Sequence, residues 1–392
     1  MRILMLNNEF PPLGGGTGTV NRAILARLAE VPGLEVDLVT SALGYRAERE
    51  RLAERVRMIK VPVANRNIHH SSGRELLTYA ALALPTALRL HRERRYDLAF
   101  AWSAVPAGGV ALALRRIAGL PYILRVCGPD IPGFERRYGP LYPLLTPTIT
   151  AIWRGAGRLV AKCQAEADMM LAVQPGLSID LVPNGVDLDA FAPAPIAGGG
   201  PLRLICVARL IERKGQHHLI AALRRLVDEG FDIRLELVGE GDARAENEAL
   251  ARRLGLAERV TFAGYVPREQ IAARYAAAHV FVLPSYNEGM SVATLEAMAA
   301  GLPTVVTRTG GAEDLVEEGV SGNIVPWADV AALAERLRPL AQRRDLARQM
   351  GAAARARAQG FTWDAAAGRY LEMFDDLVGA QEGRCAPPVP LR

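Results

Sequence analysis

Cysteine, aromatic residues and long apolar runs are all scarce in this chain of 392 residues. The four cysteines lie far apart and never form Cys-x-x-Cys, a pattern that favours buried free thiols in a reducing compartment over a disulfide framework. The longest apolar stretch, residues 141–153, is broken by Pro143 and Pro147 and is too short to span a bilayer. The N-terminus turns polar after six residues, too early for a signal peptide. We therefore expect a cytoplasmic protein, either soluble or peripheral on the inner face of the membrane.

A large excess of positive charge is also absent. The formal net charge of +5 is modest for this length and argues against a nucleic-acid-binding protein. The charge is unevenly distributed, since residues 1–190 carry 23 Lys and Arg against 17 Asp and Glu, whereas residues 191–392 carry 24 against 25. The excess of positive charge in the first half suits contact with an anionic membrane or an anionic substrate. Ordinary variation of surface charge is an equally good explanation.

A complete dinucleotide-binding fingerprint is missing as well. The run Gly14-Gly15-Gly16 follows the first predicted strand, but Thr19 and Asn21 stand where G-x-G-x-x-G needs its last glycine. No acid ends the second predicted strand, so the sequence argues against a nucleotide-dependent oxidoreductase. The glycine run still allows the backbone to approach a diphosphate or a sugar closely, and a merely flexible turn is equally compatible with it.

Predicted strands and helices alternate in two blocks. In the first block strands are predicted at residues 2–6, 36–40, 57–61, 98–102, 122–126, 158–163 and 179–182, and helices at 17–29, 74–92 and 107–117. After a Pro- and Gly-rich linker, strands recur at 203–208, 233–238, 260–264, 280–283, 304–306 and 323–325. Apolar strands alternating with helices indicate parallel sheets covered on both faces, which bind ligands at the carboxyl ends of their strands.

These patterns predict an α/β protein with two doubly wound, Rossmann-like domains that face a central cleft. The first domain is expected at residues 1–192 and the second at 200–360. A further segment at 361–380 and a disordered tail at 381–392 complete the expected organisation.

The segment from residue 284 to residue 303 carries the most information. It follows an apolar strand, and Ser291 can cap a helix that ends at Gly301. Glu288 then lies in the turn between strand and helix, and Glu296 lies on the helix. The free N–H groups of residues 289–292 can hold a phosphate or sugar oxygen, while the two acids can accept hydrogen bonds from sugar and ribose hydroxyls. A solvated loop acid and a helix acid without function are the simpler alternative.

Arg209 and Lys214 flank the loop after the first strand of the second block, and Gly215 opens the next helix. Two fixed cations at this place would neutralise a diphosphate leaving group as its charge develops. A pair of solvated basic residues is the alternative.

Three further patterns carry weaker signals. Asp187-Leu-Asp189 spells DxD but stands in a turn, so we interpret it as structural. Gly239 ends a strand, either beside a nucleotide or in a packing turn. The adjacent pairs His69-His70 and His217-His218 lack the spacing of helical metal ligands, and no metal site is expected.

Taken in order, the motifs resemble a known family. They are Pro11-Pro-x-Gly-Gly-Gly, Pro183-Asn-Gly-Val-Asp187, Arg209…Lys214-Gly215, Val238-Gly-Glu-Gly-Asp242, Phe262-x-Gly264, Pro284-Ser…Glu288-Gly…Glu296-Ala-Met-Ala-Ala-Gly-Leu-Pro303, Gly310-Gly…Asp314-Leu-Val and Phe361-Thr-Trp363…Tyr370. This series resembles the retaining glycosyltransferases of family 4, the glycosyl transferases group 1, which have the GT-B fold. The resemblance covers nearly the whole chain, and the acid–seven–acid spacing of Glu288 and Glu296 is its strongest element. It also implies that residues 361–380 form a closing helix that crosses back and packs on the first domain.

The resemblance implies a role for each candidate residue. Arg209 and Lys214 would bind the donor diphosphate and stabilise the departing nucleotide, and Glu288 would hold the hydroxyls of the transferred sugar. Further donor contacts would come from Gly15, Gly16, Gly239, Gly289, Met290, Ser291 and, on the ribose, Glu296. The implied donor is a UDP- or GDP-sugar, and no metal or other cofactor is implied.

One segment departs from the family pattern. Many relatives carry His-Gly-x-Asp after the fifth strand, whereas this chain has Cys127-Gly-Pro-Asp130. Cys127 is either a small packing residue, which we favour, or an altered sugar contact. Asp130 remains a candidate catalytic residue that would orient sugar or acceptor hydroxyls.

The acceptor is not evident from the sequence. The basic first half includes residues 74–95 and 136–154, which combine arginines with apolar stretches. They suit contact with anionic lipid and hence a lipid-linked or cell-envelope acceptor, or else they are core elements. A soluble small-molecule acceptor, a GT-B-like sugar-nucleotide epimerase and a catalytically silent sugar-nucleotide-binding protein are the alternatives.

Overall fold

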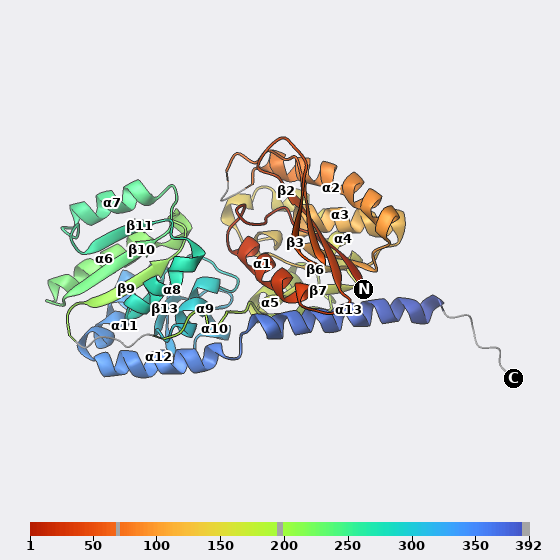
Figure 1. Ribbon diagram of the computed structural model, residues 1–392. Coiled ribbons are helices and arrows are strands. Elements are labelled where there is room, and N and C mark those ends of the chain that lie inside the picture. The colour runs from red at the N-terminus through yellow and green to blue at the C-terminus, as the bar shows by residue number, and fades with distance from the viewer. Residues whose placement is uncertain (68–70, 194–198, 386–392) are drawn as a thin grey trace. The chain divides into compact units, whose positions relative to one another are not determined.

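The computed structural model describes residues 1–67, 71–193 and 199–385 of the chain. Within it the chain forms two compact units (Figure 1). One comprises residues 1–183 and the segment from Trp363 onward, and the other comprises Asn184–Thr362. The pair His69-His70, most of the predicted linker and residues 386–392 of the predicted tail lie outside the described residues.

The first unit is built on an eight-stranded sheet. Its strands are β1 (Arg2–Leu6), β2 (Glu35–Ser41), β3 (Glu48–Ala53), β4 (Val56–Val61), β5 (Leu98–Trp102), β6 (Tyr122–Arg125), β7 (Arg158–Ala161) and β8 (Asp180–Leu181). Their order is β3-β4-β2-β1-β5-β6-β7-β8, and only β3 is antiparallel to its neighbour. The helices are α1 (Gly16–Ala29), α2 (Gly73–Arg94), α3 (Gly109–Ala118), α4 (Tyr142–Gly155), α5 (Gln164–Val173) and α13 (Trp363–Cys385).

Strand β3 is the one strand of this unit that the sequence did not predict. Its first four residues alternate acid and arginine, and five of its six residues, Leu52 included, are exposed. The strand is held by its ladder to β4 and by Lys60, whose Nζ lies 3.1 Å from carboxylate oxygens of both Glu48 and Glu50. Such an edge strand has no buried face for a periodicity argument to detect.

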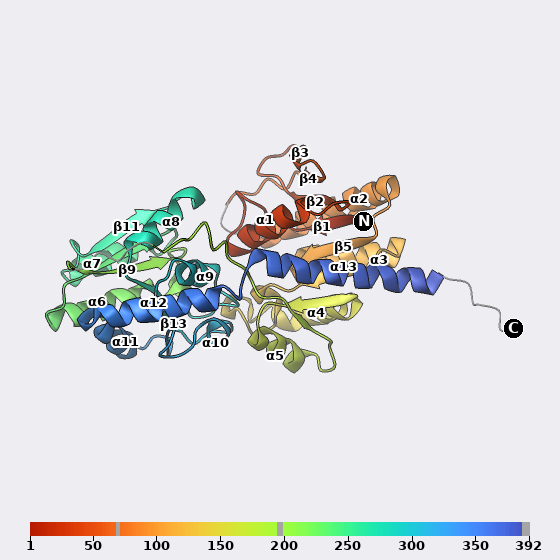
Figure 2. The same ribbon diagram turned by 60° about the horizontal axis from the view of Figure 1, so that its bottom comes forward.

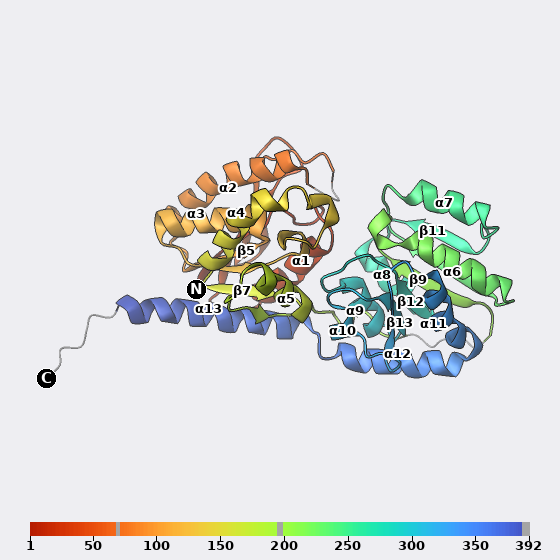
Figure 3. The same ribbon diagram turned by 180° about the vertical axis from the view of Figure 1, so that it is seen from behind.

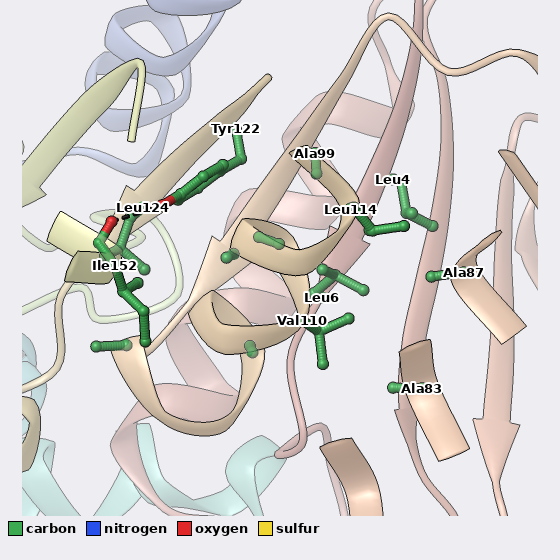
Figure 4. Close-up of a cluster of buried hydrophobic side chains, with 14 of the residues drawn as sticks. Leu4, Leu6, Ala83, Ala87, Ala99, Val110, Leu114, Tyr122, Leu124 and Ile152 are labelled. Carbon is green, nitrogen blue, oxygen red and sulfur yellow. Dashed lines mark hydrogen bonds between the residues drawn. The ribbon is translucent and has the colours of Figure 1, made fainter. Parts of the chain in front are cut away.

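Buried side chains of α2, α3 and α4 pack on one face of this sheet (Figure 4). Ala83 and Ala87 of α2 and Val110 of α3 meet the strand residues Leu4 and Leu6 in that core. The apolar middle of α2 therefore packs in the core, one of the two alternatives that the sequence left open for this segment.

Helix α13 packs against α1 and β5 (Figure 2). The ring centroids of Tyr370 and Phe374 lie 4.9 and 5.5 Å from that of Phe100. Ion pairs of Arg27 with Asp364, at 2.8 Å, and of Arg158 with Asp376, at 2.6 Å, add polar contacts. The C-terminal helix thus belongs to the first unit, and it runs to Cys385, beyond the predicted end at residue 380.

The second unit has a six-stranded parallel sheet in the order β11-β10-β9-β12-β13-β14 (Figure 3). The strands are β9 (Leu202–Val207), β10 (Ile233–Val238), β11 (Val260–Gly264), β12 (Val280–Leu283), β13 (Thr304–Thr307) and β14 (Gly322–Val325). The helices are α6 (Gln216–Asp228), α7 (Arg244–Arg253), α8 (Arg268–Ala277), α9 (Val292–Ala299), α10 (Ala312–Leu315), α11 (Val330–Gln342) and α12 (Arg344–Ala358). Helix α6 packs against α11, and α9 packs against α12.

Both sheets agree with the predicted doubly wound α/β class, and all thirteen predicted strands are present within one or two residues of their expected bounds. Cys127, Cys163 and Cys206 are buried and free, as expected. Among the described residues, no helix has the length and apolarity needed to cross a membrane.

Candidate active site

The turn between β9 and α6 packs directly on the end of β12. Gly215 has φ +67°, and a Cβ atom there would lie 2.1 Å from the carbonyl oxygen of Pro284, so only glycine fits. The backbone N–H of Tyr286 donates to the carbonyl of Arg213 at 2.6 Å. This contact between backbones brings the loop that carries Lys214 against the loop that carries Glu288.

Lys214 and Glu288 form an ion pair in which the lysine Nζ donates to Oε1 of the glutamate. Their side chains are only 13% and 17% exposed, so water screens the pair weakly. Burial alone would raise the pKa of Glu288, but the charge and hydrogen bond of Lys214, with help from Ser285 and Arg213, lower it below its usual value. Glu288 is therefore an ionised hydrogen-bond acceptor at neutral pH.

Glu296 has the opposite electrostatic environment. It lies on α9 with 9% of its side chain exposed, accepts a hydrogen bond from the Tyr275 hydroxyl at 3.1 Å, and pairs with Arg268 at 3.4 Å. Burial raises the pKa of Glu296 to about 6, and the contacts with Arg268 and Tyr275 oppose this rise only in part. The carboxyl is thus close to half protonated near pH 6, and partners that stabilise its charge would lower its pKa.

The start of α9 is held by two polar side chains. Ser291 caps the helix as predicted, accepting a hydrogen bond from the N–H of Thr294 at 3.1 Å. Asn184 donates from Nδ2 to the carbonyl of Met290 at 2.8 Å and fixes the turn that contains Gly289. A small pocket, about 10 Å³ in volume and large enough for about one water molecule, opens here beside Glu288. No local pattern in the sequence predicts the contact of Asn184 with Met290.

Gly239 serves backbone packing. A Cβ atom at this position would lie 2.1 Å from the carbonyl oxygen of Ala208, so the end of β10 can approach the segment before Arg209 only with glycine there. Arg209 is half-buried, and its carbonyl accepts a hydrogen bond from Nε2 of Gln216 at 2.9 Å. Arg209, Lys214, Glu288, Met290, Ser291 and Glu296 all lie on this second unit near the carboxyl ends of its strands.

Two remaining candidates, Gly15 and Gly16, open α1 at the carboxyl end of β1 in the first unit. No atom lies within 4 Å of where a Cβ would stand on Gly16, so packing within the unit does not require glycine there. Open space at a helix start suits the approach of a ligand oxygen to backbone N–H groups.

Asp130 is buried after β6, with 6% exposure. Its two carboxylate oxygens accept hydrogen bonds from the backbone N–H groups of Cys127, at 2.9 Å, and Val105, at 3.3 Å. Burial raises the pKa of Asp130 to about 6, opposed by these hydrogen bonds and by the charge of Lys162. The side chain joins two loops at the carboxyl edge of the sheet and positions them. No pattern in the sequence predicted this contact.

Cys127 is equally enclosed. Its sulfur lies 3.8 Å from the hydroxyl oxygen of Thr17, and burial together with the nearby charge of Asp130 raises its pKa to about 11. The thiol is therefore neutral at physiological pH and is not an activated nucleophile.

The Asp187 carboxylate accepts hydrogen bonds from the backbone N–H groups of Asp189, at 3.2 Å, and Ala190, at 3.1 Å. These bonds close a local turn.

One arginine near the end of the basic segment 74–95 forms ion pairs with acids of another element. Arg94 pairs with Glu35 and, at 3.2 Å, with the buried Asp37. Exposed apolar side chains occur instead near the first turns of α2 and α4, where Leu77 is 73% and Leu144 is 78% exposed. These helices follow the parallel strands β4 and β6, so their first turns lie at the carboxyl edge of the sheet.

Two family models match the chain. Residues 15–185 match the glycosyl transferase 4-like domain and residues 192–357 match glycosyl transferases group 1. The chain also has two doubly wound units and the Lys214–Glu288 ion pair at strand ends. The family matches and these features together define a glycosyltransferase of the GT-B class. The chain belongs to the family of glycosyl transferases group 1, known as glycosyltransferase family 4.

Curated relatives support this membership. A GDP-mannose-dependent alpha-(1-6)-phosphatidylinositol monomannoside mannosyltransferase of Mycobacterium tuberculosis is 30% identical over 400 residues, covering 95% of this chain and 98% of the relative. A D-inositol 3-phosphate glycosyltransferase of Streptomyces scabiei is 35% identical over 237 residues, covering 56% of this chain and 51% of the relative.

Solved structures share the fold. Sucrose-phosphate synthase from Thermosynechococcus elongatus matches with a TM-score of 0.86 and 24% identity over 97% of this chain and 100% of that one. Anabaena HepE in complex with UDP-glucose matches with a TM-score of 0.75 and 21% identity over 96% of this chain and 100% of that one. At these identities the similarity shows the fold alone.

The raised pKa of Glu296 predicts a pH-dependent stability. Because the folded state holds the proton more tightly than an unfolded glutamate, ionising Glu296 destabilises the fold as pH rises past 4.5 and through 6. Glu296→Gln should increase the free energy of unfolding by about 2 kcal/mol above pH 7, and this gain should vanish near pH 4. Urea unfolding at both pH values measures it, with the exposed Glu372→Gln as control. A gain that is equal at both pH values would contradict the shift.

Proposed function

We propose that the protein is a retaining, metal-independent hexosyltransferase that moves a sugar from a nucleoside-diphosphate donor to a hydroxyl of a lipid-linked or cell-envelope glycan. The observation that carries the proposal is the buried Lys214–Glu288 pair at the start of α9. A cation beside an ionised acid suits a ligand with a diphosphate next to a hydroxyl-rich ring. GDP-mannose is the first donor to test because the relative aligned over most of the chain is named for it, and UDP-glucose is the second because HepE is solved with it.

In this proposal the residues of the second unit act on the donor. Lys214 and Arg209 stabilise charge on the leaving diphosphate, Glu288 accepts hydrogen bonds from the transferred sugar, and Glu296 accepts them from the ribose. Gly239, Gly289, Met290 and Ser291 shape the binding loops, and Gly15 and Gly16 offer backbone N–H groups from the first unit. Asp130 acts as a positioning residue for the loop before it.

The reaction breaks the bond between the anomeric carbon and the diphosphate oxygen and forms a bond from that carbon to the acceptor oxygen on the same face. The acceptor proton passes to the departing diphosphate oxygen, so the step needs no covalent enzyme intermediate. The chain supplies the fixed cations and acceptors that stabilise charge separation in this step.

The lipid-linked acceptor is supported by the exposed Leu77 and Leu144 at the carboxyl edge of the first sheet and by the mannosyltransferase relative, which is named for a phosphatidylinositol mannoside. A soluble, phosphorylated polyol is the second candidate, because the relative that is 35% identical is named for D-inositol 3-phosphate. A thermal-shift and product assay with UDP-, GDP-, ADP- and TDP-sugars tests the function directly, since a ligand that binds only the folded state raises the unfolding midpoint. Donor cleavage without transfer to any acceptor would favour the epimerase.

Lys214→Ala should lower turnover by about two to three orders of magnitude, the scale of losing one well-placed charge-stabilising group. Because removal of one partner also leaves Glu288 buried without its cation, unfolding must be measured alongside turnover. The exposed Arg336→Ala, on α11, is the matched control. A folded Lys214→Ala protein with turnover within about threefold of wild type would refute the assigned role.

Transfer should continue in the presence of EDTA. The expectation follows from the turn formed by Asp187 and Asp189, in which the Asp187 carboxylate accepts backbone hydrogen bonds. Initial rates with and without chelator measure it. Loss of activity that manganese restores would show that the reaction needs a metal.

The protein should co-sediment with vesicles that contain anionic lipid. A leucine side chain buried in the interface contributes roughly 1.5–3 kcal/mol, so Leu77→Ser and Leu144→Ser should each weaken binding measurably. Ile117→Ser is the matched control, because Ile117 is 60% exposed but lies in the last turn of α3, at the opposite edge of the sheet. Protein that stays in the supernatant at low and high salt would favour the soluble acceptor.

A further inference from the structure

Three rings form a cluster beside the Lys214–Glu288 pair. The ring of Trp327 lies 5.0 Å from that of Tyr286 and 5.6 Å from that of His218, with interplanar angles of 75° and 90°. We name these three residues the Trp327 shelf.

Trp327 differs from the other tryptophans of the chain in its exposure. Trp102, Trp153 and Trp363 are 0%, 1% and 2% exposed, whereas Trp327 is 41% exposed. Tryptophan presents a large apolar area, and the part of the Trp327 indole that Tyr286 and His218 leave uncovered faces solvent. This part of the ring is available for contact with a ligand.

The shelf lies at the carboxyl edge of the second sheet. Tyr286 follows β12 and is two positions before Glu288, Trp327 follows β14, and His218 is in the first turn of α6, four positions after Lys214. In doubly wound sheets this edge is where ligands bind.

The backbone holds Trp327 in place. Ala328 has φ +62°, the left-handed region that a residue with a side chain rarely occupies, and Asp329 caps α11 through a hydrogen bond from the N–H of Ala332 at 2.8 Å. Strain of this kind persists only where the surrounding structure imposes it, and it is concentrated at functional sites.

A polar pair lies next to the rings. Arg213 donates from its guanidinium to Oδ1 of Asn287 at 3.0 Å, and its carbonyl accepts the N–H of Tyr286. An aromatic surface bordered by fixed polar groups matches the two kinds of surface of a pyranose, which has apolar C–H faces and a rim of hydroxyls.

We propose that the Trp327 shelf binds a pyranose ring of the substrate, with its C–H face on the indole and its hydroxyls toward Arg213 and Asn287. The inference rests on the proposed function and adds a specificity-determining residue to it. The ring belongs either to the transferred sugar of the donor or to the acceptor glycan, and the two sources share one chemistry.

Iodide quenching of tryptophan fluorescence tests the proposal on the unaltered full-length protein, because Trp327 is the accessible indole. The probes are GDP-mannose and UDP-glucose, each compared with its bare nucleoside diphosphate, and methyl α-mannoside. Protection by a nucleotide sugar but not by its nucleotide assigns the shelf to the donor sugar, and protection by the methyl glycoside assigns it to the acceptor.

Kinetics supply the second readout. Trp327→Ala should raise KM for the sugar-bearing substrate about three- to tenfold with little change in kcat, the range expected for losing one aromatic contact. Trp327→Phe, which keeps a ring, should restore most of the affinity, and Val320→Ala, which alters another exposed apolar residue of this unit, should match wild type.

The outcomes distinguish a failure of the Trp327 shelf from a failure of the proposed function. If a nucleotide sugar raises the unfolding midpoint and is turned over, yet no probe protects Trp327 and Trp327→Ala matches wild type, the shelf is refuted and the proposed function stands. If no nucleotide sugar binds or reacts, the proposed function fails. Protection by methyl α-mannoside in that case would still support a sugar-binding shelf, and its absence would refute both.

Discussion

The contact of Lys214 with Glu288 is the constraint on which the geometry of the candidate site in the second unit depends. It joins the loop after β9 to the loop after β12, two neighbouring strands of the parallel sheet. Both charges are largely buried, so each is tolerated only while the other is present. Gly215 allows the pair to form, because any side chain at this position would hold the two backbones apart. The pair therefore fixes a cation and an anion side by side before any ligand arrives, and such preorganisation lowers the cost of binding and reaction.

Two glutamates eight positions apart acquire opposite properties from their surroundings. Lys214 keeps the pKa of Glu288 below its usual value, whereas burial raises the pKa of Glu296 to about 6 against the opposing contacts with Arg268 and Tyr275. A ligand hydroxyl that donates to Glu296 would stabilise the ionised form, so binding at this site and ionisation are coupled. The fold thus carries an electrostatic cost at Glu296, and under the proposed function the ribose of the donor would relieve it.

The sequence was informative where function is encoded in a continuous segment of strand, turn and helix. Ser291 caps α9 and Gly215 opens α6 as predicted, because capping and left-handed turns have local signatures. Contacts between distant segments were not predictable. The hydrogen bond from Asn184 to Met290 and the burial of Glu296 against Tyr275 depend on packing that no local pattern records.

In two places the charge pattern of the sequence did not reveal the structural role of a segment, because that role depends on a neighbouring element. The sequence of β3 alternates acids and arginines and gives no strand periodicity, because an edge strand is held by its ladder and not by a buried face. The arginines at the end of α2 were compatible with contact with lipid or with a structural role, and one of them, Arg94, pairs with the buried Asp37. A cluster of basic residues indicates a surface for anionic ligands only when no acid of another element pairs with it. Such pairing depends on the tertiary structure and is not visible in the local sequence.

In the first unit, Cys127 stands where many relatives have histidine, and the loop after β6 keeps its structure. The loop after β6 is held by the carboxylate of Asp130, which accepts hydrogen bonds from the backbone N–H groups of Cys127 and Val105, so the side chain of residue 127 need not supply a hydrogen bond to keep the loop in place. The position is therefore free to carry a thiol where the family resemblance leads one to expect an imidazole. With its pKa raised to about 11, that thiol is neutral and cannot exchange protons near pH 7 as an imidazole does. Under the proposed function, proton transfer and charge stabilisation would come from other groups, and the Lys214–Glu288 pair of the second unit is the fixed charge pair to which the proposal assigns the stabilisation.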